Sequence, residues 1–186
     1  MKNIKFSEII SKFLDINIPE SKGKNEGDTS HGIAWEKTLM SIFDTYKVSY
    51  VYQPNGAQKP PEFTVTHKGK SLDIDQKLSK TGKPMWNSTL PKEKSLYLIG
   101  STNDNRCGVW FGNTLLPAKE RERLESFHKA MLTLVSAYNT GVGEKNYYYG
   151  QRGRYDTRFN PVNAKVNLFD EINNSIGEID DYFEER

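Results

Sequence analysis

The sequence predicts an α/β protein in which a mixed β-sheet is flanked by α-helices. Three observations predict this class. Apolar residues recur at helical spacing near the N-terminus and again late in the chain, and several short alternating runs typical of strands lie between them. Two of these runs are joined by so short a turn that they must form an antiparallel hairpin. Because no linker and no internal repeat divides the 186 residues, we expect a single domain over residues 1–186, with its core at about 31–139.

The expected elements follow one another in a simple order. The helices are residues 6–16, 31–46 and 116–139, and the strands are residues 48–53, 62–67, 71–79, 95–101 and 107–113. Thr29 or Ser30 can cap the second helix, and Lys-Gly-Lys at 68–70 is a tight turn. The last helix has the clearest apolar stripe, formed by Leu124, Phe127, Met131, Leu134, Val135 and Tyr138.

Composition excludes several classes of protein. An aromatic share of 12% argues against a disordered chain, and no apolar run approaches the roughly 20 residues of a membrane span. The N-terminus lacks the apolar core and cleavage site of a signal peptide. The one cysteine, Cys107, cannot form an internal disulfide and is better explained as a buried strand residue than as a nucleophile. We therefore expect a cytoplasmic protein with no membrane partner.

The charge of the chain is unevenly distributed. The net charge is +2, but the last eighteen residues hold seven acidic residues and one basic residue. The rest of the chain therefore has 25 basic against 17 acidic residues, a net charge of +8. A net positive charge over residues 1–168 favours a polyanionic partner.

Two carboxylates and a lysine are expected to converge on the hairpin. Alternation along residues 71–79 sends Leu72, Ile74 and Gln76 to one face of the sheet and Asp73, Asp75 and Lys77 to the other. Glu62 opens the neighbouring strand, so Glu62, Asp75 and Lys77 can meet. Two adjacent carboxylates ionise together only beside a cation, and Mg²⁺ is a cation that one or two carboxylates bind. Asp73 shares the face, and it replaces Asp75 as the ligand if the register differs.

Glu36 is a further candidate acid. On the second helix it lies in line with Leu39 and Phe43, so its carboxylate is expected to face the sheet. Such a carboxylate needs a partner, and two alternatives stay open: the metal site, or a structural lysine or arginine.

These residues carry a resemblance to a known family. Pro-Glu at 61–62 followed by Asp-Gln-Lys at 75–77 resembles the signature of the PD-(D/E)xK nucleases, although the first acid is Glu62 where that signature usually has Asp. The upstream "GIAWEK" is similar to a helix with an inward glutamate that often precedes the signature. The downstream "KLSKTGKPMWNSTLP" resembles a segment of some type II restriction endonucleases. The resemblance covers about residues 31–115.

The resemblance implies a restriction-endonuclease-like core and Mg²⁺-dependent hydrolysis of phosphodiester bonds in double-stranded DNA at a specific short sequence. It implies that Glu62 and Asp75 are metal ligands, that Lys77 is the catalytic lysine and that Glu36 is an auxiliary acid. Because short DNA sites are commonly read by two-fold symmetric proteins, we expect a homodimer. The alternatives are a repair or recombination nuclease of the same fold that reads DNA structure, and a non-catalytic DNA-binding protein.

Residues that would contact DNA lie in two basic segments. The candidates are Lys80, Lys83, Trp86, Asn87, Tyr149, Arg152, Arg154 and Arg158. Simple packing is the alternative for Trp86, and an ordinary exposed strand pair is the alternative for the Tyr- and Arg-rich segment. We expect residues 140–186 to contact DNA or to form the dimer interface.

Overall fold

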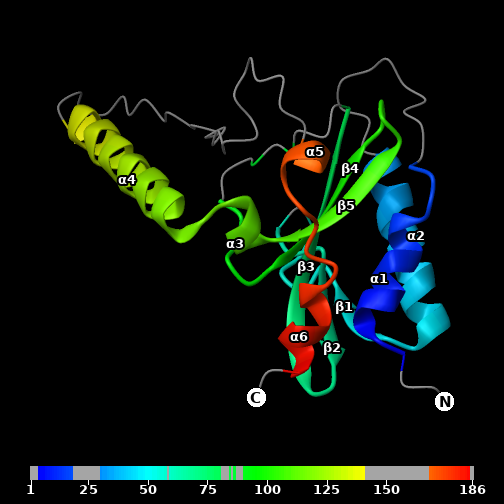
Figure 1. Cartoon of the computed structure of the whole chain (residues 1–186). Helices are drawn as coiled ribbons and strands as arrows, with labels where there is room; N and C mark the ends of the chain where they lie inside the picture. The colour runs from blue at the N-terminus through cyan, green and yellow to red at the C-terminus, as the bar shows by residue number, and fades with distance from the viewer. Residues whose placement is uncertain are drawn as a thin grey trace.

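The fold is an α/β arrangement built on a five-stranded sheet (Figure 1). The structure is a computed structural model, and it describes residues 4–18, 30–57, 59–80, 84, 86, 90–140 and 168–184. Its elements are α1 (Phe6–Leu14), α2 (Ser30–Tyr46), β1 (Ser49–Tyr52), β2 (Phe63–His67), β3 (Lys70–Ser79), β4 (Leu96–Ser101), β5 (Arg106–Phe111), α3 (Gly112–Leu115), α4 (Ala118–Thr140), α5 (Leu168–Glu171) and α6 (Glu178–Glu184).

The sheet is mixed, as the sequence predicts. Its strand order is β1-β2-β3-β4-β5; β3 and β4 are parallel, and the other neighbouring strands are antiparallel. The predicted hairpin joins β2 to β3, with His67 opposite Lys70. Lys68 and Gly69 both have positive φ, as the two-residue hairpin turns of type I′ require. This turn fixes the register that places β2 and β3 side chains opposite one another.

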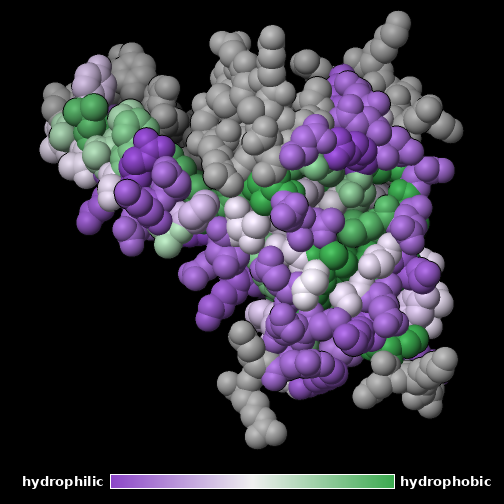
Figure 2. All heavy atoms as spheres, in the orientation of Figure 1, coloured by the Kyte–Doolittle hydropathy of each residue, from purple (hydrophilic) through white to green (hydrophobic). Residues whose placement is uncertain are grey.

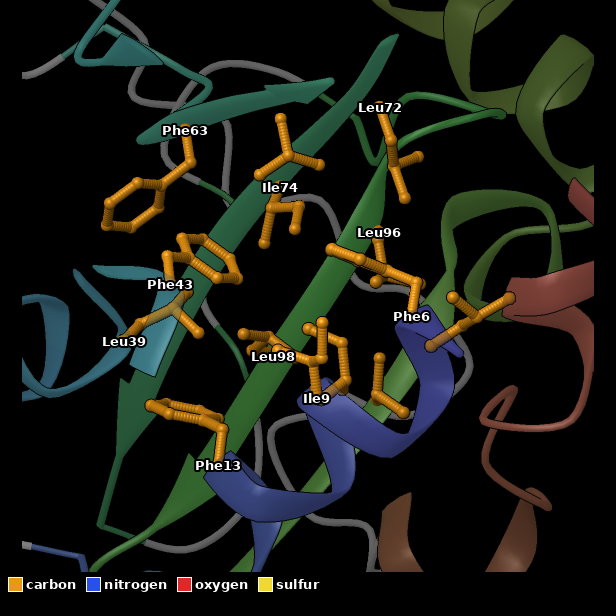
Figure 3. Packing of buried hydrophobic residues seen from close by; sticks show 14 of the residues in the cluster. Phe6, Ile9, Phe13, Leu39, Phe43, Phe63, Leu72, Ile74, Leu96 and Leu98 are labelled. Carbon is orange, nitrogen blue, oxygen red and sulfur yellow. The ribbon is translucent and has the colours of Figure 1, made fainter. Parts of the chain in front are cut away.

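One face of the sheet carries the main hydrophobic core. Figure 3 shows Phe6, Ile9 and Phe13 pointing from α1 toward the strands, where Leu96 and Leu98 lie. These α1 residues recur every three or four positions, so one side of the helix is buried. The helical residues of this core are Phe6, Ile9, Ile10, Phe13, Trp35, Leu39, Phe43, Ile179 and Phe183, from α1, α2 and α6.

The other face of the sheet carries a second, smaller cluster. Its buried members are Trp86, Tyr97, Ile99, Trp110, Leu115 and Leu168. Leu115 comes from α3 and Leu168 from α5, so helical segments lie on this side as well. Alternation along β3 sends Leu72 and Ile74 into the main core. The intervening polar residues of β3 therefore lie on the side of the smaller cluster.

The described end of the acidic segment packs against the body of the protein. Ile179 and Phe183 of α6 belong to the main core. The Asp180 carboxylate of α6 accepts hydrogen bonds from both the backbone N–H and the hydroxyl of Ser7 in α1. Among the described helices, none is both long and apolar enough to cross a membrane.

Gly112 begins α3 at a very close approach of two backbone segments. Its N–H donates to the Ser95 carbonyl at 2.9 Å, and a Cβ added here would overlap the carbonyl oxygen of Lys92. We expect Gly112→Ala to lower the free energy of unfolding by about 2–3 kcal/mol, because backbone must move to make room. Urea denaturation measures this change.

Gly32 provides the matched control for that substitution. It lies in the first turn of α2, and nothing stands within 4 Å of the position of its missing Cβ. Because alanine is the better helix former, Gly32→Ala should raise the free energy of unfolding by up to about 1 kcal/mol. Equal denaturation midpoints for the two variants would contradict the close approach at Gly112.

Candidate active site

Glu62 and Asp75 are brought together by the β2–β3 hairpin. Phe63 pairs with Ile74, so Glu62, one residue before β2, lies beside Asp75 on the neighbouring strand. The backbone N–H of Gln76 donates to Glu62 Oε2 at 2.9 Å and holds this carboxyl group in place. Asp75 is only 4% exposed. The two predicted metal ligands are therefore neighbours in a largely buried site.

Glu62 keeps a proton beside Asp75 near neutral pH. Burial, then a hydrogen bond to Asp75 and the Asp75 charge, raise the pKa of Glu62 from its ordinary value of 4.5 to about 8, although Lys77 and the Gln76 N–H act in the opposite direction. At neutral pH Glu62 therefore keeps a proton that it would lose in water. A divalent cation between Glu62 and Asp75 would take the place of that proton.

Lys77 completes the predicted trio. Its Nζ lies 2.7 Å from Asp75 Oδ1, and the lysine side chain is 24% exposed. Alternation along β3 puts both side chains on the same face. The ammonium group of Lys77 thus contacts Asp75, and part of the side chain remains accessible to solvent.

An aromatic pair borders the lysine. The Lys77 Nζ lies 5.9 Å from the centre of the Trp86 ring, and Trp86 packs edge-on against Tyr97 at a centroid separation of 5.0 Å. Trp86 is 3% exposed, so in this structure its ring is packed, as the packing alternative expects, and is not presented at the surface. Its cation–π contact restricts the position of the lysine.

Tyr97 belongs to the site, although it was not among the sequence candidates. It lies opposite Asp75 across the parallel β3–β4 pair, and its hydroxyl accepts a 2.7 Å hydrogen bond from the Lys92 backbone N–H. Burial raises the pKa of Tyr97 well above its ordinary value, and the charges of Asp75 and Glu62 add to this. The phenol therefore stays neutral beside the carboxyl pair. A tyrosine inside an otherwise apolar strand was the available signal in the sequence.

Glu36 is connected to the site through Tyr52 of β1. The Tyr52 hydroxyl donates to Glu36 Oε2 at 2.5 Å. This bond, together with burial and the charges of Glu36 and Glu62, raises the pKa of Tyr52 to about 12. The hydrogen-bond partner of Glu36, on helix α2, is thus a tyrosine of strand β1, where the sequence left a metal or a basic residue as the alternatives. Within the described ranges, no three or more His, Cys, Asp or Glu side chains converge on one point.

Asp73 has a different partner from Asp75. Its Oδ1 accepts a 2.8 Å hydrogen bond from the Thr64 hydroxyl, directly across the β2–β3 pair. The observed register therefore puts Asp75, and not Asp73, beside Glu62. This favours Asp75 between the two alternatives that the sequence leaves open.

The expected DNA contacts are only partly visible. Lys80 is exposed at the end of β3, where its carbonyl oxygen accepts bonds from Ser101 and Asn103. The other candidates, Lys83, Asn87, Tyr149, Arg152, Arg154 and Arg158, lie outside the described residues. In the described part of the chain, Lys77 is thus the basic residue in contact with the carboxyl pair, and Lys80 lies three residues further along.

Comparisons of this chain with protein-family models, with curated proteins and with solved structures find no match. Any inference about function therefore rests on the residues of the site. Two carboxyl groups and one ammonium group are a small set, but Mg²⁺ characteristically binds one or two carboxylates and fills its remaining positions with water and phosphate oxygens. The donor set fits this ion.

Proposed function

We propose that this chain is a Mg²⁺-dependent endonuclease that hydrolyses phosphodiester bonds in double-stranded DNA, of the type II restriction kind. One observation carries the proposal. The partly buried Glu62 lies beside the buried Asp75, and the ammonium group of Lys77 lies 2.7 Å from Asp75. A pair of acids beside one lysine suits metal-assisted hydrolysis of a phosphodiester.

The order of the elements supports a restriction-endonuclease-like core. A helix that carries Glu36 precedes the hairpin, the hairpin carries Glu62, Asp75 and Lys77, and the next strand, β4, runs parallel to β3. This is a mixed sheet flanked by helices, which the PD-(D/E)xK resemblance implies. The proposed partners are double-stranded DNA and a second copy of the chain.

Each residue has a proposed role. Glu62 and Asp75 would hold Mg²⁺, which supplies positive charge to the scissile phosphate and lowers the pKa of a bound water. Lys77 is held by Asp75 and Trp86, so its ammonium group can orient the attacking water or stabilise charge that develops on the phosphate. Glu36 acts on the site through Tyr52, as an auxiliary acid that does not touch the substrate.

Cleavage of supercoiled plasmid DNA tests the proposal. We expect cleavage with Mg²⁺ and none with a chelator in its place. Discrete fragments support a sequence-specific restriction enzyme, whereas smearing, or cutting confined to branched DNA, supports the repair alternative. The absence of cleavage on a panel of plasmid, genomic and branched DNA would overturn the enzymatic proposal. It would leave a non-catalytic domain in which Lys77 simply neutralises Asp75.

A further inference from the structure

Gln53 has an unusual backbone conformation at the start of the loop between β1 and β2. Its φ is 48°, in the left-handed region that residues other than glycine seldom occupy. Pro54 follows it, and a residue before proline ordinarily takes an extended conformation. Since both preferences oppose this backbone, the conformation persists because the surrounding contacts hold it. The contacts of Gln53 therefore indicate what this position does.

The backbone of Gln53 is tied to Glu62, the proposed metal ligand. Its N–H donates to the Glu62 carbonyl oxygen at 2.7 Å, one residue beyond the paired part of β1 and β2. Its own carbonyl oxygen accepts from the Gly56 N–H at 2.9 Å and closes a turn. Glu62 is thus held twice, at its backbone by Gln53 and at its carboxyl group by the Gln76 N–H.

The side chain of Gln53 is tied to the hydrogen-bonded pair of Tyr52 and Glu36. Its Nε2 donates to the Tyr52 hydroxyl oxygen at 2.9 Å, and that hydroxyl donates to Glu36 Oε2 at 2.5 Å. Because the Tyr52 oxygen accepts from the amide, its single proton is directed to the carboxylate. The bond to Glu36 is the main cause of the raised pKa of Tyr52, and the charge of Glu62 contributes. This hydroxyl therefore lies within electrostatic reach of Glu62.

Gln53 bonds with protein groups where surface residues ordinarily bond with water. Hydrophilic side chains predominate on the face that Figure 2 shows, and exposed side chains of this kind find most of their partners in water. Gln53 is half-buried, and its N–H, its carbonyl oxygen and its side-chain amide each have a partner within the protein. One residue thus connects the backbone of Glu62 to the hydroxyl that binds Glu36.

We propose that Gln53 is a positioning residue for the Mg²⁺ site, which fixes Glu62 through its backbone and Tyr52 through its side chain. The inference rests on the proposed function, because it assigns Gln53 to the same metal site. Gln53 touches neither the cation nor the substrate and acts through its two partners. Partners of this kind around a metal ligand typically contribute about tenfold to a hundredfold in metal affinity.

Gln53→Met tests this role, because methionine keeps an unbranched side chain of similar length and removes the amide. Without the bond to Tyr52, residue 53 can relax toward the extended backbone that a following proline favours, and this displaces Glu62. Urea unfolding at rising Mg²⁺ concentration measures Mg²⁺ binding without DNA, since a cation that binds only the folded state raises its stability. We expect Gln53→Met to need about tenfold more Mg²⁺ than the wild type for the same stabilisation.

Lys47→Met is the matched control. Lys47 is exposed and also has a left-handed φ, of 56°, but it lies at the opposite end of β1. It should respond to Mg²⁺ like the wild type. If Mg²⁺ stabilises the wild type and Gln53→Met equally, or if both variants lose the same Mg²⁺ affinity, Gln53 has no positioning role although the metal site stands. If Mg²⁺ stabilises none of the three proteins, the metal site is wrong, and the proposed function falls together with this inference.

A double-mutant cycle tests whether the amide acts through Tyr52. Tyr52→Phe removes the hydroxyl and keeps the ring, which lies 5.3 Å from the Phe63 ring between centroids. Gln53→Met should then weaken Mg²⁺ binding in the wild type and weaken it little further in the Tyr52→Phe background. If the two substitutions instead add in full, the amide does not act through the hydroxyl, and the proposed connection is wrong.

Discussion

Asp75→Ala and Lys77→Ala are each expected to lower Mg²⁺-dependent cleavage of plasmid DNA by about a thousandfold or more. Asp75 is both a proposed metal ligand and the group that holds the Lys77 ammonium at 2.7 Å, so its loss removes two contributions at once. Loss of Lys77 removes the positive charge that we propose faces the reacting phosphate. Asp75 is buried and Lys77 is largely covered, so affinity for DNA, measured without Mg²⁺, should change little.

Two neighbours on the same strand serve as matched controls. Asp73 lies on the same face as Asp75 but accepts its hydrogen bond from Thr64, and Lys70 donates to the Tyr182 carbonyl at the other end of β3. Asp73→Ala and Lys70→Ala should cleave within about tenfold of the wild type, since neither group contacts the carboxyl pair. If Asp73→Ala abolishes cleavage and Asp75→Ala does not, then Asp73 is the ligand and the site is assigned incorrectly. Normal cleavage by both Asp75→Ala and Lys77→Ala would place the active site elsewhere.

The local elements of the fold could be predicted because their signals are local. The β2–β3 hairpin is specified by alternation on both sides of Lys68-Gly69, and that turn allows one register only. The same register puts Asp75 beside Glu62, so the core of the site followed from a single short segment. The predicted mixed sheet was also confirmed, and its strands could be predicted because their signals are local as well. The apolar runs at β4 and β5 contain few residues that suit any element but a buried strand.

Contacts between distant segments could not be predicted in the same way. Tyr97 reaches the site because β4 lies parallel to β3, and no residue pattern specifies the register of two strands joined by a crossover. The acidic C-terminal segment was interpreted from its charge, but Ile179 and Phe183 are spaced as one helical face and pack with α1. For α4, periodicity identified the apolar stripe, yet periodicity does not identify the surface that covers it.

Glu62→Gln is expected to stabilise the metal-free protein above about pH 8 and to reduce its response to Mg²⁺. The pKa of Glu62 is about 8 in the folded protein against an ordinary value of 4.5, so between these values the folded state holds a proton that the unfolded state has lost. The stability that this proton contributes is fully present below about pH 4.5 and is lost as pH rises through about 8. At 1.36 kcal/mol for each pKa unit, the shift from 4.5 to about 8 corresponds to a loss in the wild type of at most about 5 kcal/mol.

The glutamine variant should escape this loss because its amide imitates the protonated acid. Its oxygen can still accept from the Gln76 N–H, and its NH₂ can donate to Asp75 at any pH. The measurement is urea unfolding of both proteins from pH 4 to pH 9, with a chelator and again with excess Mg²⁺, and Glu93→Gln at an exposed position is the control. The difference between wild type and variant removes contributions that both share. With Mg²⁺ the order of stability should invert at high pH, because the cation stabilises the ionised form of Glu62 beside Asp75. A difference between wild type and variant that stays constant from pH 4 to pH 9 would show that the pKa of Glu62 is not raised.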